Sequence, residues 1–133
     1  MEIKWNESFS VFNHDLDSQH QRLFEMLNSF QEEMKHNPDN KKSFQKIIHG
    51  LKEYTLVHFT AEEKHMILMN YPYLEVHQSK HIQFIDKIDE YDSRIKTGEN
   101  VLPFEIITFL KEWLTRHIYV EDKQYANYKL SKI

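Results

Sequence analysis

Residues 41–69 read KKSFQKIIHGLKEYTLVHFTAEEKHMILM, and this stretch decides the fold. Its inward side chains recur every three or four residues, which is the spacing of one face of an α-helix. This stripe consists of Phe44, Ile48, Leu51, Thr55, His58 and Glu62. Because the stripe is apolar at first and ends in a histidine and a glutamate, we expect a long helix that buries polar side chains near its C-terminal end.

Three further stretches have the same periodicity, and short breaks separate them. The breaks are Asn37-Pro38-Asp39-Asn40, Asn70-Tyr71-Pro72 and Thr97-Gly98. Proline disfavours helix at the residue before it, and glycine often ends a helix. The predicted helices span about 17–36, 41–69, 73–96 and 103–128, with Asp17 or Ser18 as the first cap.

Short breaks between four helices predict an all-α fold, an up-down-up-down antiparallel four-helix bundle. The apolar residues before position 17 lack helical spacing. We therefore expect residues 1–16 to form an extended N-terminal arm over the bundle. The whole chain, 1–133, is expected to be a single domain.

The composition excludes several classes of function. The net charge is −4 without a basic stripe, which argues against a nucleic-acid partner. No apolar run approaches membrane-spanning length, and the N-terminus does not resemble a signal peptide. Cysteine is absent, which removes disulfides, thiolate zinc sites, iron–sulfur clusters and thiol catalysis. We expect a cytoplasmic monomer.

Histidines and carboxylates on the inward stripes lie at alternating ends of the four predicted helices. In an antiparallel bundle, alternating ends meet at one end of the molecule. The residues expected to converge there are His20, His58, Glu62, His77, His81, His117 and Asp122. We expect the other four histidines, His14, His36, His49 and His65, to be peripheral.

The spacing of His117 and Asp122 differs from that of the other pairs. His58 and Glu62 are four residues apart and so share one helix face. His117 and Asp122 are five apart, which turns them about 140° from each other in a regular helix. If both face inward, the helix needs a π-bulge between them, a distortion common at functional sites.

This cluster favours metal binding over a purely hydrogen-bonded core. One inward histidine is usually a hydrogen-bonded core residue, but burying several unpaired polar groups together is costly. Nitrogen and oxygen ligands suit Fe, Mn, Zn or Ni. Two six-coordinate ions have twelve coordination positions. Five imidazoles, two bridging carboxylates and one bridging oxygen would occupy eleven of them. One small ligand could bind at that open position.

The chain resembles the hemerythrins over nearly its whole length. The resemblance is carried by Trp5-x-x-x-Phe9, Leu16-Asp17-Ser18-Gln19-His20, His58-Phe59-Thr60-Ala61-Glu62-Glu63, Tyr71-Pro72, His77-x-x-x-His81 and Trp113-Leu114-x-x-His117-Ile118-x-x-x-Asp122-x-x-Tyr125. It implies two iron ions joined by an oxo or hydroxo bridge. The implied ligands are His77, His81 and His117 for the saturated iron, His20 and His58 for the iron with the open position, and Glu62 and Asp122 as bridges.

The surroundings of the site fit this resemblance independently. Helical spacing places Leu23, Phe59, Trp113 and Leu114 beside the ligands. They would line a dry O2 pocket, and core packing explains the same residues equally well. Tyr125, one turn beyond Asp122, could hydrogen-bond a bridging carboxylate. Asn13 departs from the apolar residue of many relatives, and would alter oxygen affinity or autoxidation if it pointed inward.

The function expected from these features is reversible O2 binding for storage, delivery or buffering, without enzymatic turnover. The alternatives are a di-iron oxidase or peroxidase, a nitric-oxide-handling enzyme, and O2 or redox sensing through a separate partner. An enzyme needs a positioned acid or base beside its substrate. The expected pocket residues are apolar apart from Asn13, which favours binding.

Overall fold

In the computed structural model, which describes residues 2–132, the chain forms a bundle of helices. The long helices are α1 (His14–His36), α2 (Lys41–Leu68), α3 (Leu74–Lys96) and α4 (Pro103–Arg116). A π-helix, η2 (His117–Asp122), joins α4 to α5 (Lys123–Ser131), and a short 3-10 helix, η1 (Glu7–Phe9), lies in the N-terminal arm. The expected breaks at residues 37–40, 70–72 and 97–98 all separate helices.

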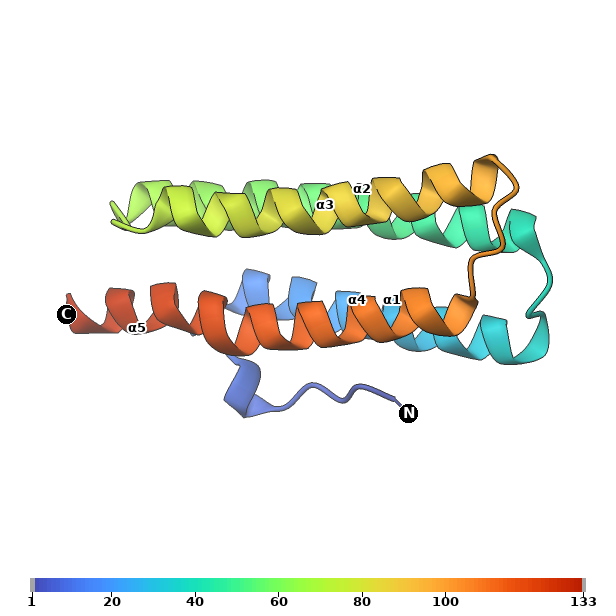
Figure 1. Ribbon diagram of the computed structural model, residues 1–133. Helices are drawn as coiled ribbons and strands as arrows, with labels where there is room; N and C mark the ends of the chain where they lie inside the picture. Colours follow the sequence, from blue (N-terminus) through green and yellow to red (C-terminus); the bar gives the residue numbers. More distant parts are fainter. Residues whose placement is uncertain (1, 133) are drawn as a thin grey trace.

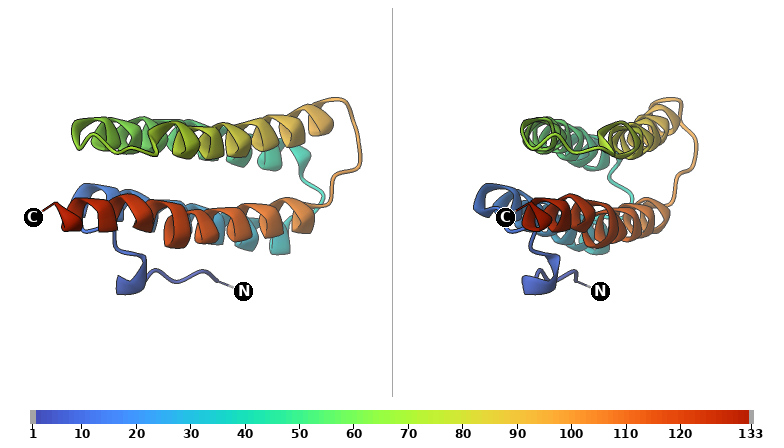
Figure 2. Two further views of the ribbon diagram at one scale, coloured as in Figure 1. Left: turned by 60° about the vertical axis from the view of Figure 1, so that its left-hand side comes forward. Right: turned by 90° about the vertical axis from the view of Figure 1, so that its left-hand side faces the viewer.

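The helices pack in two layers. Figure 1 shows α2 beside α3 in one layer and α1 beside α4 in the other, with α5 continuing the line of α4. The end-on view in Figure 2 shows these four rods at the corners of a bundle, with the arm outside the layer of α1 and α4. The predicted all-α antiparallel four-helix bundle is therefore confirmed.

The start of α1 differs from the prediction. The helix begins at His14, and its cap is Asn13, whose Oδ1 accepts a hydrogen bond from the Leu16 N–H at 3.0 Å. Asp17 does not cap the helix, because its carboxylate accepts from the Val11 N–H at 2.8 Å and from the Ser10 hydroxyl at 2.6 Å. The predicted N-terminal arm is present but ends at Asn13, a few residues before the expected end near residue 16. The predicted cap at Asp17 or Ser18 was wrong.

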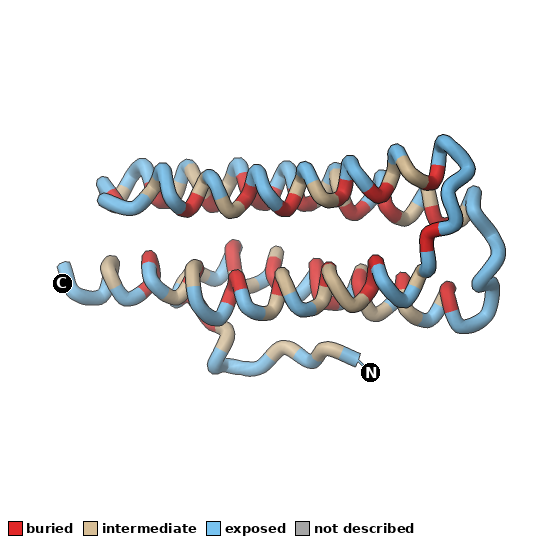
Figure 3. Tube along the Cα trace, in the orientation of Figure 1, coloured by how far each residue is buried: buried red, intermediate tan, exposed pale blue. Residues whose placement is uncertain are grey.

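Buried residues line the surfaces where the two layers meet (Figure 3). The larger apolar cluster fills the middle and the end of the bundle near the breaks at 37–40 and 97–102, and includes Leu23, Phe30 and Leu114. A second cluster lies at the opposite end and consists of Val11, Leu16, Met66, Tyr71, Tyr125 and Ala126. Along α1, His20 lies between Leu16 of one cluster and Leu23 of the other, so apolar packing covers both sides of the polar residues.

Within the described residues, no helix combines the length and the apolar character needed to cross a bilayer.

Candidate metal centre

The seven predicted ligand residues meet in the interior between the two apolar clusters. Each is at most 3% exposed: His20, His58, Glu62, His77, His81, His117 and Asp122. They come from α1, α2, α3 and η2. The structure thus brings together residues that lie up to about a hundred positions apart in the chain.

The π-helix explains how His117 and Asp122 both reach this point. They are the first and last residues of η2. A π-helix closes its hydrogen bonds between residues five apart, so its turn is wider than that of an α-helix. Residues five apart then share a face, and the predicted bulge between His117 and Asp122 is confirmed.

The Glu62 carboxylate is divided between two groups of histidines. Its Oε1 lies 3.1 Å from His77 Nε2 and 2.9 Å from His81 Nε2. Its Oε2 lies 3.1 Å from His20 Nε2 and 3.2 Å from His58 Nε2. Each oxygen of one side chain therefore faces a different set of imidazoles.

The Asp122 carboxylate is divided in the same way. Its Oδ1 lies 2.9 Å from His77 Nε2 and 3.1 Å from His117 Nε2, and its Oδ2 lies 3.1 Å from His20 Nε2. Two overlapping ligand groups result: Glu62, His77, His81, His117 and Asp122 in one, and His20, His58, Glu62 and Asp122 in the other. We call them the three-histidine group and the two-histidine group. They share both carboxylates, as two bridged ions require.

The unsatisfied polar atoms of the cluster fit a bound cation. Both oxygens of Asp122 are buried, and their contacts of 2.9–3.1 Å with imidazole nitrogens lack the geometry of hydrogen bonds. His81 Nε2 and His117 Nε2 lie 3.1 Å apart, a contact that requires a proton or a cation between two nitrogen lone pairs. Because the donors are imidazole nitrogens and carboxylate oxygens without thiolates, they suit Fe, Mn, Zn or Ni.

The electrostatics of the cluster agree with this assignment. Burial alone lowers the pKa of His20 and His77, but the Asp122 and Glu62 carboxylates outweigh burial and raise both pKa values to about 9. The nearby histidines in turn hold the pKa values of Glu62 and Asp122 below their ordinary range, against the opposing effect of burial. Without metal, protons on the imidazoles balance the negative charge of the ionised carboxylates, and a metal ion displaces these protons when it binds.

Two of the imidazoles are oriented by residues that the sequence analysis did not single out. The Nδ1 of His58 lies 2.6 Å from Gln19 Oε1, and the Nδ1 of His81 lies 2.7 Å from Glu63 Oε2. Since these oxygens accept a hydrogen bond from Nδ1–H, the proton stays on Nδ1 and the Nε2 atoms are free to bind a metal. Gln19 directly precedes His20 and Glu63 directly follows Glu62 in the chain. Both stand in the motifs that carry the resemblance to the hemerythrins, and those motifs are the sequence signal that could have identified them.

The other predicted site residues surround the cluster with one exception. The Tyr125 hydroxyl donates to Glu62 Oε2 at 3.2 Å. Phe59 stacks flat on His81, with 3.6 Å between ring centroids, and the half-buried Trp113 stacks on His117 at 4.5 Å. Leu23 and Leu114 are buried in the larger apolar cluster. The exception is Asn13, because its side chain caps α1 and so does not act as a partner of the ligands.

The remaining histidines lie outside both ligand groups. His14, His36 and His49 are exposed. His65 is half-buried and packs edge-on against Tyr125, with 5.7 Å between ring centroids. All four are peripheral, as expected.

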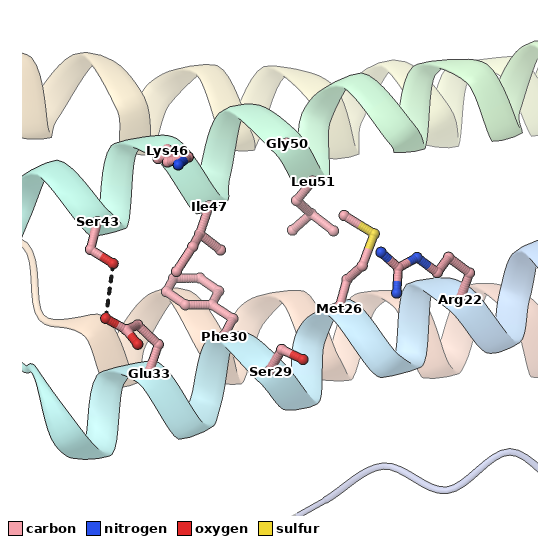
Figure 4. Close-up of a pocket in the computed structure, with 10 residues that line it drawn as sticks. All are labelled: Arg22, Met26, Ser29, Phe30, Glu33, Ser43, Lys46, Ile47, Gly50 and Leu51. Atoms are coloured by element: carbon pink, nitrogen blue, oxygen red, sulfur yellow. Dashed lines mark hydrogen bonds between the residues drawn. The ribbon is translucent and has the colours of Figure 1, made fainter.

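A separate groove of about 510 Å³ lies between α1 and α2 (Figure 4). Its apolar walls are formed by Met26, Phe30, Ile47 and Leu51. A hydrogen bond of 3.0 Å between the Ser43 hydroxyl and Glu33 Oε1 crosses it. None of the seven ligand residues lines this groove, so it is distinct from the metal cluster.

Fold and site together define a metal-binding four-helix bundle whose ligand groups are joined by shared carboxylates. The model of the Hemerythrin HHE cation binding domain matches residues 11–128. The chain belongs to the hemerythrin family.

Individual relatives agree with this membership. The chain is 31% identical to a bacteriohemerythrin of Stenotrophomonas maltophilia, over 94% of this chain and 80% of the relative. It is 29% identical to a bacteriohemerythrin of Clostridium acetobutylicum, over 92% of this chain and 98% of the relative. A crystal structure of wild-type hemerythrin superposes with a TM-score of 0.87, over 96% of this chain and 97% of that one, at 23% identity. This last likeness supports the fold.

Proposed function

We propose that the protein binds O2 reversibly at a pair of iron ions, for storage, delivery or buffering of oxygen. The observation that carries this proposal is the division of the Glu62 and Asp122 carboxylates, each with one oxygen toward each ligand group. Such shared carboxylates suit two adjacent ions. Membership of the hemerythrin family, whose members are typically O2-binding proteins, supports the same function.

The two ligand groups differ in their number of imidazoles, so they would leave different numbers of coordination positions open on their ions. The three-histidine group, with both carboxylates, would nearly fill the coordination of its ion. The two-histidine group supplies one imidazole fewer and would leave a position for a small ligand. Bound iron would supply the electrons for O2 binding and that open position.

The protein around the cluster keeps water away. Leu23, Phe59 and Leu114 are at most 3% exposed, and the two apolar clusters close the bundle above and below the ligands. A dry apolar wall slows loss of reduced oxygen and oxidation by solvent, because charged products are poorly solvated there. Since these wall residues are apolar, they favour ligand binding over acid–base turnover.

The proposal is tested by the optical spectrum of iron-loaded protein, reduced without air, then exposed to air and finally freed of oxygen. A visible charge-transfer band that appears with O2 and disappears on its removal is the expected result. A one-way change to a stable oxidised spectrum would contradict reversible binding and favour an oxidase. That the chain is a single domain, a monomer and cytoplasmic stays a prediction. Mass measurement in solution checks the oligomeric state, and cell fractionation checks the location.

A further inference from the structure

Two of the three imidazoles in the three-histidine group have a carboxylate beside Nδ1, the ring nitrogen that points away from the ligand cluster. His81 Nδ1 lies 2.7 Å from Glu63 Oε2. His117 Nδ1 lies 3.6 Å from Glu121 Oε1, within ion-pair distance but without a hydrogen bond. The side chains of Glu63 and Glu121 are 26% and 21% exposed, so solvent screens their charge only in part. Gln78 Nε2 also donates to the other oxygen of Glu63 at 3.0 Å, which holds that carboxylate in place.

Among the described residues, neither imidazole of the two-histidine group has a carboxylate paired with its Nδ1. His58 Nδ1 lies 2.6 Å from the amide oxygen of Gln19. The Nδ1 of His20 is buried and has no hydrogen-bond partner among the described residues. Gln19 therefore orients His58 as Glu63 orients His81, but with a neutral acceptor.

This difference has a definite electronic effect. A carboxylate that accepts a hydrogen bond from the N–H of an imidazole makes that imidazole a more basic ligand and adds negative charge near the ion. Net charge and hydrogen bonding around an iron site set its reduction potential, since negative charge favours the higher oxidation state. An amide acceptor fixes the ring without adding that charge.

We propose that Glu63 and Gln19 are positioning residues that make the two iron sites electrically unequal, so that the three-histidine iron is oxidised first. Removing one electron from a pair of Fe(II) ions, with ferricyanide as the acceptor, then leaves Fe(III) in the three-histidine group and Fe(II) in the two-histidine group. This inference rests on the proposed function, because it requires a pair of irons. Its consequence is that the iron with the open position keeps its electron longer.

The two one-electron reduction potentials of the iron-loaded protein test this inference. Glu63→Gln keeps an oxygen acceptor for His81 but removes the charge, so the first oxidation shifts to a more positive potential, and by more than the second. Gln19→Glu adds a charge behind His58, so the second oxidation shifts to a more negative potential, and by more than the first. Both changes narrow the gap between the potentials.

Glu53→Gln is the matched control, because it removes one negative charge from the exposed face of the same helix, α2. It is expected to leave both potentials unchanged. Thermal unfolding of each metal-free variant distinguishes a structural role of Glu63 or Gln19 from an electronic one. A purely structural role would change the midpoint temperature of unfolding but not the reduction potentials. If Glu63→Gln fails to hold two irons, Gln19→Glu decides the question alone.

The inference is overturned if Glu63→Gln leaves both potentials unchanged or shifts the second at least as much as the first. Failure of the proposed function looks different. Wild-type protein would then take up no redox-active pair of irons, or would bind O2 irreversibly. Unchanged potentials in a wild type and variant that both bind O2 reversibly would refute only the role of Glu63.

Discussion

The Tyr125 hydroxyl donates a hydrogen bond of 3.2 Å to Glu62 Oε2, and both side chains are fully buried. This contact links α5 to α2 directly beneath the ligands. The accepting oxygen is the one that faces His20 and His58. Tyr125 thus holds a shared carboxylate from the side opposite the larger apolar cluster.

Tyr125→Phe is expected to lower the free energy of unfolding by about 1–3 kcal/mol, because a buried carboxylate loses a donor while the ring packing remains. Denaturant titration of the metal-free protein measures the change. Tyr128→Phe is the control, because its hydroxyl donates to the Asn70 carbonyl at 3.3 Å in a solvent-exposed hydrogen bond, and the change should cost less than about 0.5 kcal/mol. Equal effects of the two changes would contradict a special role for the Tyr125 hydroxyl.

His81→Ala is expected to prevent loading of two metal ions per chain. The change removes a ligand of the three-histidine group and exposes Glu62 Oε1 to an empty space. Elemental analysis of the purified, iron-loaded variant gives the stoichiometry. His36→Ala, at an exposed position outside both groups, should keep two metals per chain. A His81→Ala protein with two metals would refute the assignment of this ligand.

Leu114→Ala is expected to leave iron bound but to speed autoxidation, because it opens the apolar wall one turn before His117. The cavity should also lower the unfolding free energy by about 2–5 kcal/mol. Leu110→Ala makes a similar cavity one turn further from the ligands, and both leucines are 1% exposed. The decay of the oxygenated spectrum measures autoxidation. Equal rates in the two variants would show that Leu114 does not guard the site.

The metal-free protein is expected to be most stable at about pH 6. The raised pKa values of His20 and His77 contribute stability that is complete below their ordinary value of 6.5 and is lost as pH rises through about 9. The lowered pKa values of Glu62 and Asp122 contribute stability that is lost as pH falls below their ordinary values of 4.5 and 3.8.

Urea midpoints between pH 4 and 9 check this dependence, with metal-loaded protein as the control. Loaded protein should keep its stability up to pH 9, because the metal replaces the protons and competes better with them as pH rises. A metal-free protein whose midpoint increases from pH 6.5 to 9 would contradict protonated imidazoles in the empty site.

Several features could be predicted from local spacing alone. The stripe ending in His58 and Glu62, and its counterparts on the other helices, determined both the bundle and the end at which the ligands meet. The five-residue interval between His117 and Asp122 determined the π-helix. Spacing suffices in these cases because a helix has a fixed rotation per residue, so the faces of its side chains follow from the sequence.

Tertiary structure alone decided which side chains on different elements meet. Aspartate is a common N-cap residue, so the sequence favoured Asp17 as a cap. The arm instead brings Ser10 and Val11 to its carboxylate, and Asn13 caps α1. Glu63 on α2 meets His81 on α3 only at the rotation and axial offset that these two helices adopt. Those offsets are set by packing of whole apolar faces, a sum over many weak contacts. The residues of the site were therefore determined by the sequence, and the division of its carboxylates and the charge behind each imidazole were determined by the packed bundle.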